Sequence, residues 1–300
     1  MLLMRKSITA QLYSFLVFLQ AALIVTGGSV RLTGSGLGCP TWPECTPGSY
    51  TPVPNQAEGQ IHAWIEFGNR LLTFVLLLAA LVVFILSIRI SKVASNKRRI
   101  RVLAALQILG ILGQGVLGGI TVLTDLHPTT VAAHYILSIF LIAGALSLKY
   151  EIVGIPLEKP SGVIAFLIPI LVWNTLLVLI AGTIVTGSGP HAGDKDSARF
   201  GFDPRVVSWL HADLVIALLI ITSILYLLAR QSNLPRVSSR LRIFLFIALA
   251  QGLIGYIQYF TGLPEVVVAA HLIGSTLVWG FVWSIAKMTQ SGFRLQGLQK

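Results

Sequence analysis

Residues 114–134 read QGVLGGITVLTDLHPTTVAAH, and residues 251–271 read QGLIGYIQYFTGLPEVVVAAH. The two segments align without a gap and share 10 of 21 positions, including both Gln-Gly starts and both Ala-Ala-His ends. Upstream, TGGSVRLTGSG at 26–36 resembles AGTIVTGSG at 181–189. Such self-similarity indicates a chain built from repeated structural units. The sequence therefore predicts two related halves, residues 1–150 and 151–300.

The chain is strongly apolar, with 55% hydrophobic residues, 11% charged residues and a mean hydropathy of +0.81. Soluble domains carry about 25% charged residues, so this composition indicates a membrane protein. Most of the apolar stretches approach the roughly 20 residues that a helix needs to cross a bilayer. There are eight, at 8–30, 63–88, 102–123, 129–148, 163–186, 206–229, 243–260 and 266–286. We expect the first to be a retained helix rather than a signal peptide, and the seventh is the shortest.

Four helices in each half insert both halves with the same orientation, which makes the repeat a parallel one. We therefore expect an all-α integral membrane fold with eight transmembrane helices. They would form two pseudo-symmetric parallel four-helix bundles, each with its polar sites facing the bundle interior.

Lysine and arginine set the orientation, because cytoplasmic loops carry an excess of both. With the N-terminus inside, 17 of the 22 lie on the inner side, Arg5, Lys6, Arg294 and Lys300 among them. The outer five are Arg31, Arg70, Lys195, Arg199 and Arg205. The pattern predicts a multi-pass protein of the bacterial cell membrane with both termini cytoplasmic. It also accounts for the net charge of +11, so nucleic acid is not an expected partner.

The only two cysteines, Cys39 and Cys45, lie in the first outer loop, among Pro and Gly residues. On the oxidising side of a membrane this spacing indicates a disulfide that closes a small loop. The disulfide could be a structural staple or a redox group, and the sequence leaves both open.

Four polar side chains lie 15 to 20 residues from the next inner basic residue: His134, His211, His271 and Asn69. At 1.5 Å per residue, all four lie a turn or two below the outer surface. His62 lies about two turns further out by the same count.

In the second half, His211 and His271 form a pair matched in depth. Two imidazoles on facing helices of a bundle can hold a haem iron axially. The alternative is that each histidine only hydrogen-bonds a neighbouring helix. The first half has His134 but carries Asn69 where His211 has its counterpart. This asymmetry suggests a bound cofactor in one half and a substrate in the other.

The second apolar stretch begins IHAWIEFGNR at residues 61–70. His62, Glu66 and Asn69 share one helix face, and Arg70 follows Glu66 at the spacing of a helical ion pair. Glu66 could be a proton donor or acceptor, or Glu66 and Arg70 could simply neutralise each other. Arg31 and Arg70 could bind acidic ligand groups such as propionates, or could be solvated charges at the rim.

With these residues identified, the chain resembles the haem A synthases of cytochrome oxidase assembly, over nearly its whole length. The resemblance rests on GGSVRLTGSGLGCPTWPEC, IEFGNRLL, AAHYILS and AAHLIGS. Many members have Glu-x-x-His-Arg where this chain has Glu66-Phe-Gly-Asn69-Arg70, so it looks like an actinobacterial-like variant with Asn in place of His.

The resemblance implies oxidation of the C8 methyl group of haem O to a formyl group, giving haem A. It implies haem b as cofactor, bound by His211 and His271 in the C-terminal half. Haem O would bind His134 in the N-terminal half, with Glu66 catalytic and Cys39 and Cys45 disulfide-bonded. It also implies two partners, a haem O synthase and a membrane electron donor. A diheme b-type electron-transfer protein is the first alternative, and a transporter built on the repeat is the second.

Overall fold

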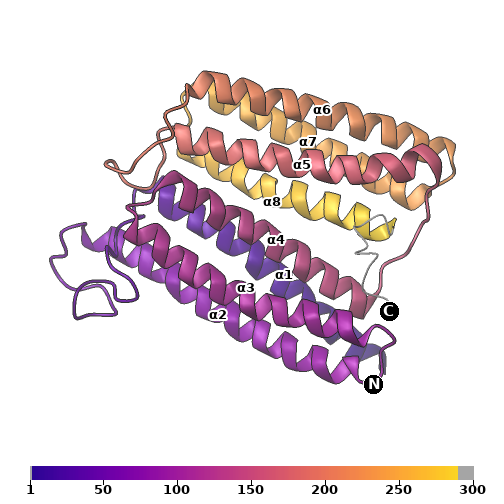
Figure 1. Ribbon diagram of the computed structural model, residues 1–300, viewed down its shortest axis with the longest axis horizontal. Helices are drawn as coiled ribbons and strands as arrows, with labels where there is room; N and C mark the ends of the chain where they lie inside the picture. Colours follow the sequence, from indigo (N-terminus) through magenta and orange to yellow (C-terminus); the bar gives the residue numbers. More distant parts are fainter. Residues whose placement is uncertain (1, 290–300) are drawn as a thin grey trace.

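The chain folds into long helices that are joined by short turns and two longer connections in the computed structural model, which describes residues 2–289 (Figure 1). Arg294 and Lys300 lie outside the described residues, as do the side chains of Arg5 and Lys6. The helices are α1 (Leu2–Leu32), α2 (Gln60–Ser91), α3 (Lys97–Leu123), α4 (Pro128–Val153), α5 (Gly162–Ser188), α6 (Pro204–Gln231), α7 (Pro235–Thr261) and α8 (Glu265–Met288).

Every one of these eight helices is long and apolar enough to cross a membrane. Many large apolar side chains point outward, such as Phe74 on α2 and Phe246 on α7, which are 68% and 74% exposed. An apolar outer surface of this extent is suited to lipid rather than water. The protein is therefore an all-α, multi-pass membrane protein, as the sequence predicts.

The seventh helix is longer than the apolar stretch at 243–260 that predicts it. It begins at Pro235, in the first helical position, where the missing N–H group has no helical partner to lose. Gly262 ends it in the left-handed conformation, with φ of 76°. The added first two turns carry Arg236, Arg240 and Arg242, so hydropathy alone placed the start too late.

The helix contacts divide the chain into α1–α4 and α5–α8. In each group consecutive helices contact one another, and the first helix also contacts the fourth. The second and fourth helices of each group therefore lie diagonally opposite each other. Figure 1 shows the two groups as neighbouring layers, and the long α1–α2 and α5–α6 connections lie at the same end. An exact symmetry between the halves stays a prediction.

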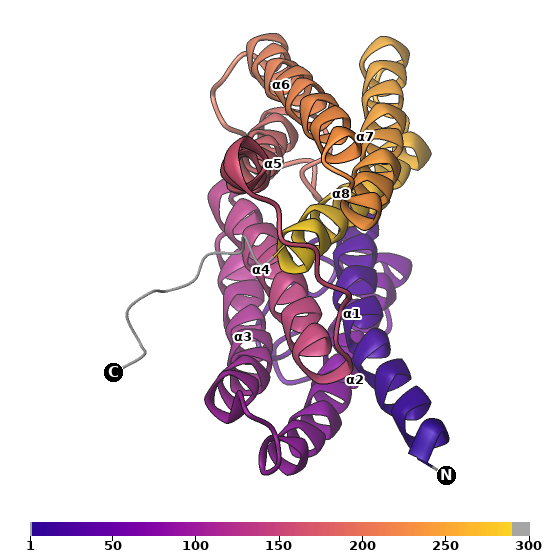
Figure 2. The same cartoon turned by 90° about the vertical axis from the view of Figure 1, so that its right-hand side faces the viewer.

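The two groups meet where α1 and α4 contact α8, near the centre of the end-on view in Figure 2, and α4 also contacts α5. Trp279 of α8 is fully buried there, and its indole N–H donates to the carbonyl of Ile139 at 2.6 Å. The Tyr135 hydroxyl lies 3.0 Å from Ser275 Oγ. Because lipid offers no hydrophobic force between helices, such buried hydrogen bonds help to join the halves.

Candidate functional site

Three helices, α4, α6 and α8, have few buried residues at the end near the long α1–α2 and α5–α6 connections. On α6 the buried residues begin at Leu218, and on α8 they begin at Gly274. On α4 no buried residue lies between Pro128 and Ile139. The interior-facing positions beyond these points are only partly buried. On these three helices the side chains at this end are therefore only partly covered by the rest of the chain.

His211 and His271 each lie seven residues before a buried residue of the same helix. His211 precedes the buried Leu218, and His271 precedes the buried Val278. Seven residues are close to two helical turns, so both imidazoles lie on the core-facing side of their helices. The two imidazoles belong to diagonally opposite helices of the bundle, α6 and α8.

Asn69 and His134 occupy the corresponding places in the first half. Asn69 precedes the buried Leu76 by seven residues, and His134 precedes the buried Leu141 by the same distance. They too lie on diagonally opposite helices, α2 and α4. Each of the four side chains thus lies about two turns before a buried residue of its own helix, and their common depth stays a prediction.

A glycine on the preceding helix faces each of these four side chains. A methyl group added to Gly118 would lie 3.1 Å from His134 Nε2, and one added to Gly27 would lie 3.8 Å from Asn69 Nδ2. In the second half the same construction gives 3.4 Å from Gly182 to His211 Cε1 and 3.7 Å from Gly255 to His271 Cε1. The glycines leave space for planar side chains inside the bundle.

The second-half histidines fit the requirements of an axial haem ligand. His211 Nδ1 lies 3.0 Å from the carbonyl of Val178, which can only accept, so Nδ1 carries the proton. Nε2 then keeps its lone pair for a metal, and the carbonyl fixes the ring orientation. His271 Nδ1 is buried and has no hydrogen-bond partner among the described residues. A buried ring nitrogen without a partner is rare in native structures, so His271 Nδ1 could bond to a group that the chain itself does not supply.

The backbone around His134 is held by Gln114, the first residue of the repeated segment. The Gln114 amide donates to the His134 carbonyl at 3.0 Å and to Ser138 Oγ at 2.7 Å.

Asn69 of α2 is held by a residue of α1: the Thr26 hydroxyl donates to Asn69 Oδ1 at 2.8 Å. Thr26 is a site residue that sequence reasoning missed, although the repeat pairs it with Ala181 and so marks a difference between the halves.

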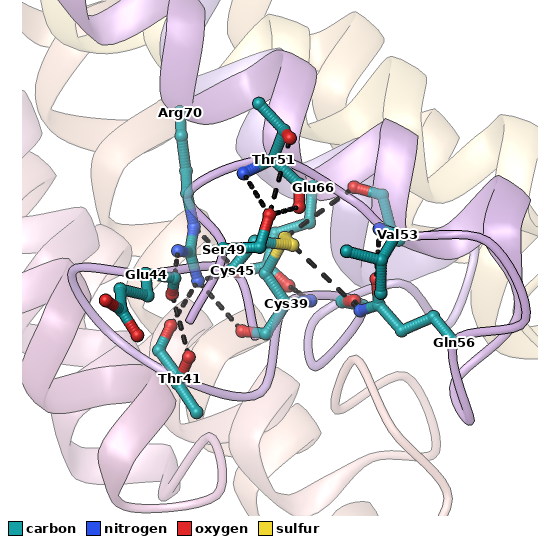
Figure 3. The surroundings of a disulfide bond; sticks show 12 residues. Cys39, Thr41, Glu44, Cys45, Ser49, Thr51, Val53, Gln56, Glu66 and Arg70 are labelled. Carbon is teal, nitrogen blue, oxygen red and sulfur yellow. Dashed lines mark hydrogen bonds and ion pairs between the residues drawn. A yellow bond between two sulfur atoms is a disulfide. The ribbon is translucent and has the colours of Figure 1, made fainter. Parts of the chain in front are cut away.

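Glu66 and Arg70 form an ion pair at 2.6 Å, as their spacing predicts (Figure 3). Glu66 is 6% exposed, and its second carboxylate oxygen accepts the Cys39 backbone N–H at 2.7 Å. The Arg70 guanidinium donates to the carbonyls of Cys39, Thr41 and Glu44 at 2.8, 3.0 and 3.2 Å. The pair therefore fastens the outer loop to α2, a contact that no sequence pattern revealed.

The same loop contains the disulfide between Cys39 and Cys45, so that prediction is confirmed. Both cysteines are fully buried. Gln56 donates to the Gly38 carbonyl beside the disulfide, and Trp42 lies against Gly119 of α3. The loop thus closes over the outer end of the first bundle.

Two other sequence candidates lie away from the bundle interior. The Arg31 guanidinium donates to the carbonyl of His191 in the α5–α6 connection, while its Nε is buried without a partner among the described residues. His62 Nδ1 lies 2.8 Å from Ser35 Oγ, so His62 belongs with the outer loop, as its higher position predicts. The structure thus assigns protein partners to Arg31 and Arg70, and a propionate role for either stays a prediction.

Comparison with known proteins adds the family. The family model described as cytochrome oxidase assembly protein matches residues 10–193, well over half of the chain. The chain belongs to this family. The match includes Glu66, Asn69 and His134 and ends before α6, so the assignment of His211 and His271 rests on the internal repeat and on the structure.

Relatives of this cytochrome oxidase assembly family member include proteins named heme A synthase. The one from Geobacillus thermodenitrificans is 30% identical over 126 residues, 41% of this chain and 34% of the relative. The one from Lysinibacillus sphaericus is 29% identical over 178 residues, 59% of this chain and 55% of the relative. The aligned part of the chain thus spans between a third and just over half of these relatives.

Proposed function

We propose that this protein is a haem A synthase, which oxidises the C8 methyl group of haem O to a formyl group. The observation that carries the proposal is the asymmetry between repeat-related positions: His211 and His271 in one half, Asn69 and His134 in the other. A permanent cofactor is best held by two strong ligands. A substrate that must bind, react and leave is better held by one.

In the second half, His211 and His271 hold a haem b. The Val178 carbonyl orients His211, and Gly182 and Gly255 give both imidazoles room. When bound, the haem supplies the electron-transfer chemistry that the side chains lack. The residues around it supply ligation, orientation and an apolar, water-poor environment.

In the first half, His134 is the one strong ligand for the substrate haem O. Gln114 fixes the backbone of His134 through its carbonyl, and Gly118 leaves space beside Nε2. The outer loop covers this end of the bundle and excludes water from the reacting methyl group. A haem O synthase, which supplies the substrate, and a membrane electron donor would then be its partners.

Glu66 is the residue that accepts or donates protons during the oxidation. Its Oε1 faces Arg70 and its Oε2 faces the Cys39 N–H. A proton taken up at Oε2 would weaken the contact to Cys39, so proton transfer and the position of the loop are linked. Arg70 keeps the carboxylate in place through the loop carbonyls.

The distribution of lysine and arginine supports a further part of the proposal: the protein lies in the bacterial cell membrane with both termini cytoplasmic. The bundle level that holds the four candidate ligands then lies toward the outer surface, on the same side as the disulfide loop.

Expression with a haem O-producing partner tests the proposed activity. Haem extracted from the purified protein and from the membranes should include a formyl-bearing haem that is missing when the gene for this chain is left out. Recovery of only unmodified haem O from haem-loaded protein would contradict the proposal and favour a diheme electron-transfer protein.

A further inference from the structure

We propose that Asn69, oriented by Thr26, is the hydrogen-bond donor of a small-ligand site on the open face of the first-half haem. This inference rests on the proposed haem site at His134. The site would take a neutral ligand of the size of water or a diatomic molecule, able to accept one hydrogen bond. Thr26 would be a positioning residue that acts through Asn69.

The contact between Thr26 and Asn69 fixes the direction of the carboxamide. Because the Thr26 hydroxyl donates to Oδ1 at 2.8 Å, the Nδ2 end points away from Thr26. Nδ2 lies over Gly27, and a methyl group there would make only ordinary contact, at 3.8 Å. Among the described residues, no protein acceptor receives its N–H groups, and Nδ2 is not among the buried, unpartnered atoms. The amide thus presents free donors.

In the second half, His211 occupies the position that corresponds to Asn69, and there it would be a permanent haem ligand. There His211 Nδ1 bonds to the carbonyl of Val178, four residues before Gly182. In the first half the equivalent carbonyl belongs to Leu23, four residues before Gly27, and the Thr26 hydroxyl lies 3.4 Å from it. The repeat places Ala181 where the first half has Thr26. The first half thus combines two changes, His to Asn and Ala to Thr.

The two changes have a joint effect on the site that the loss of the histidine alone would not have. An amide is a weak metal ligand compared with imidazole, so Asn69 leaves the position opposite His134 exchangeable. Threonine then holds the amide oxygen, and the N–H groups of Asn69 are left without a protein acceptor among the described residues. A donor held beside an exchangeable position favours a ligand that accepts a hydrogen bond.

Carbon monoxide binding to the reduced, purified protein tests the site without measuring activity. We expect a CO-dependent absorption change and one infrared C–O stretching band from wild type. Asn69→Leu keeps the branched shape and the number of side-chain heavy atoms but removes the donor, so the band should move to higher frequency while CO still binds. Thr26→Val should shift it in the same direction by less. Asn69→His should abolish CO binding and add a second low-spin haem signal.

Thr183→Val is the matched control, because its hydroxyl donates only to the Ile180 carbonyl on the second-half helix α5. It should leave the CO band unchanged. If both haems are present but Asn69→Leu and Thr26→Val leave the band unmoved, or wild type binds no CO, this inference is overturned while the proposed activity stands. If His134→Ala leaves the haem content unchanged, the proposed haem O site fails instead.

Discussion

The two halves of this protein have similar helix packing and differ at one of the candidate ligand positions. In each half, two polar side chains on diagonal helices lie seven residues outward from buried core residues, each facing a glycine. The second half completes the pattern with His211 and His271. The first has Asn69 instead of a second histidine and adds Thr26, the Glu66–Arg70 pair and a disulfide-closed loop. Under the proposed function, this difference would let one scaffold hold a cofactor permanently in one half and a substrate transiently in the other.

Removing a second-half histidine should have the largest effect of the changes considered, a loss of bound haem b. We expect His271→Ala to lose the haem b, because a single imidazole is left for the iron. The haem b content, measured by pyridine haemochrome on purified protein, should fall to near zero. His127→Ala is the control, since His127 only caps α4 through Thr129. That change should cost about 1 kcal/mol and keep the haem. Haem b retained in His271→Ala would break the comparison.

Glu66→Gln should have the next largest effect, and on the first half alone. Its amide oxygen can still accept from Cys39, but it cannot carry a proton as a carboxylate does. Loss of a general acid–base group costs about 10²- to 10⁴-fold in rate, so haem A formation should fall in that range with haem content unchanged. Glu44→Gln serves as control, because that carboxylate only holds the Gly48 N–H in the loop. Full activity in Glu66→Gln would reduce the pair to a structural role.

Replacing Cys39 and Cys45 together by serine should have a smaller effect. The loop that they close is short, with a sequence separation of 6. Closing so short a loop stabilises a protein by about 2 kcal/mol in the chain-entropy model. We expect a lower thermal unfolding temperature and a partial loss of haem A formation, with the second-half haem untouched. An activity loss as complete as that of Glu66→Gln would instead indicate a redox role for the disulfide.

The smallest expected effect separates two repeat-related glycines. Gly118→Ala places a methyl group 3.1 Å from His134 Nε2, whereas Gly255→Ala places one 3.7 Å from His271 Cε1. Both changes gain about 1 kcal/mol of helix propensity, so the comparison isolates the steric term. We expect weaker first-half haem binding in Gly118→Ala and unchanged second-half binding in Gly255→Ala, measured by haem titration. Equal results in the two variants would remove Gly118 from the site.

The sequence predicted the features that depend on composition and local spacing. Eight apolar stretches, the Glu66–Arg70 spacing and the two cysteines led directly to the helices, the ion pair and the disulfide. The attachment of the outer loop to Arg70 could not be predicted, because it depends on backbone carbonyls that carry no residue-specific signal. Thr26 was missed for a similar reason: a threonine in an apolar helix usually bonds its own backbone, and only its partner Asn69 gives it a role.

The most direct test of the asymmetry is the haem content of the wild type and two single variants, expressed with a haem O supply. We predict that the wild type holds haem b together with haem O or haem A. His134→Ala should keep haem b alone, and His211→Ala should lose haem b. Equal loss of both haem types in each variant, or haem O retained without His134, would contradict the assignment of a cofactor half and a substrate half.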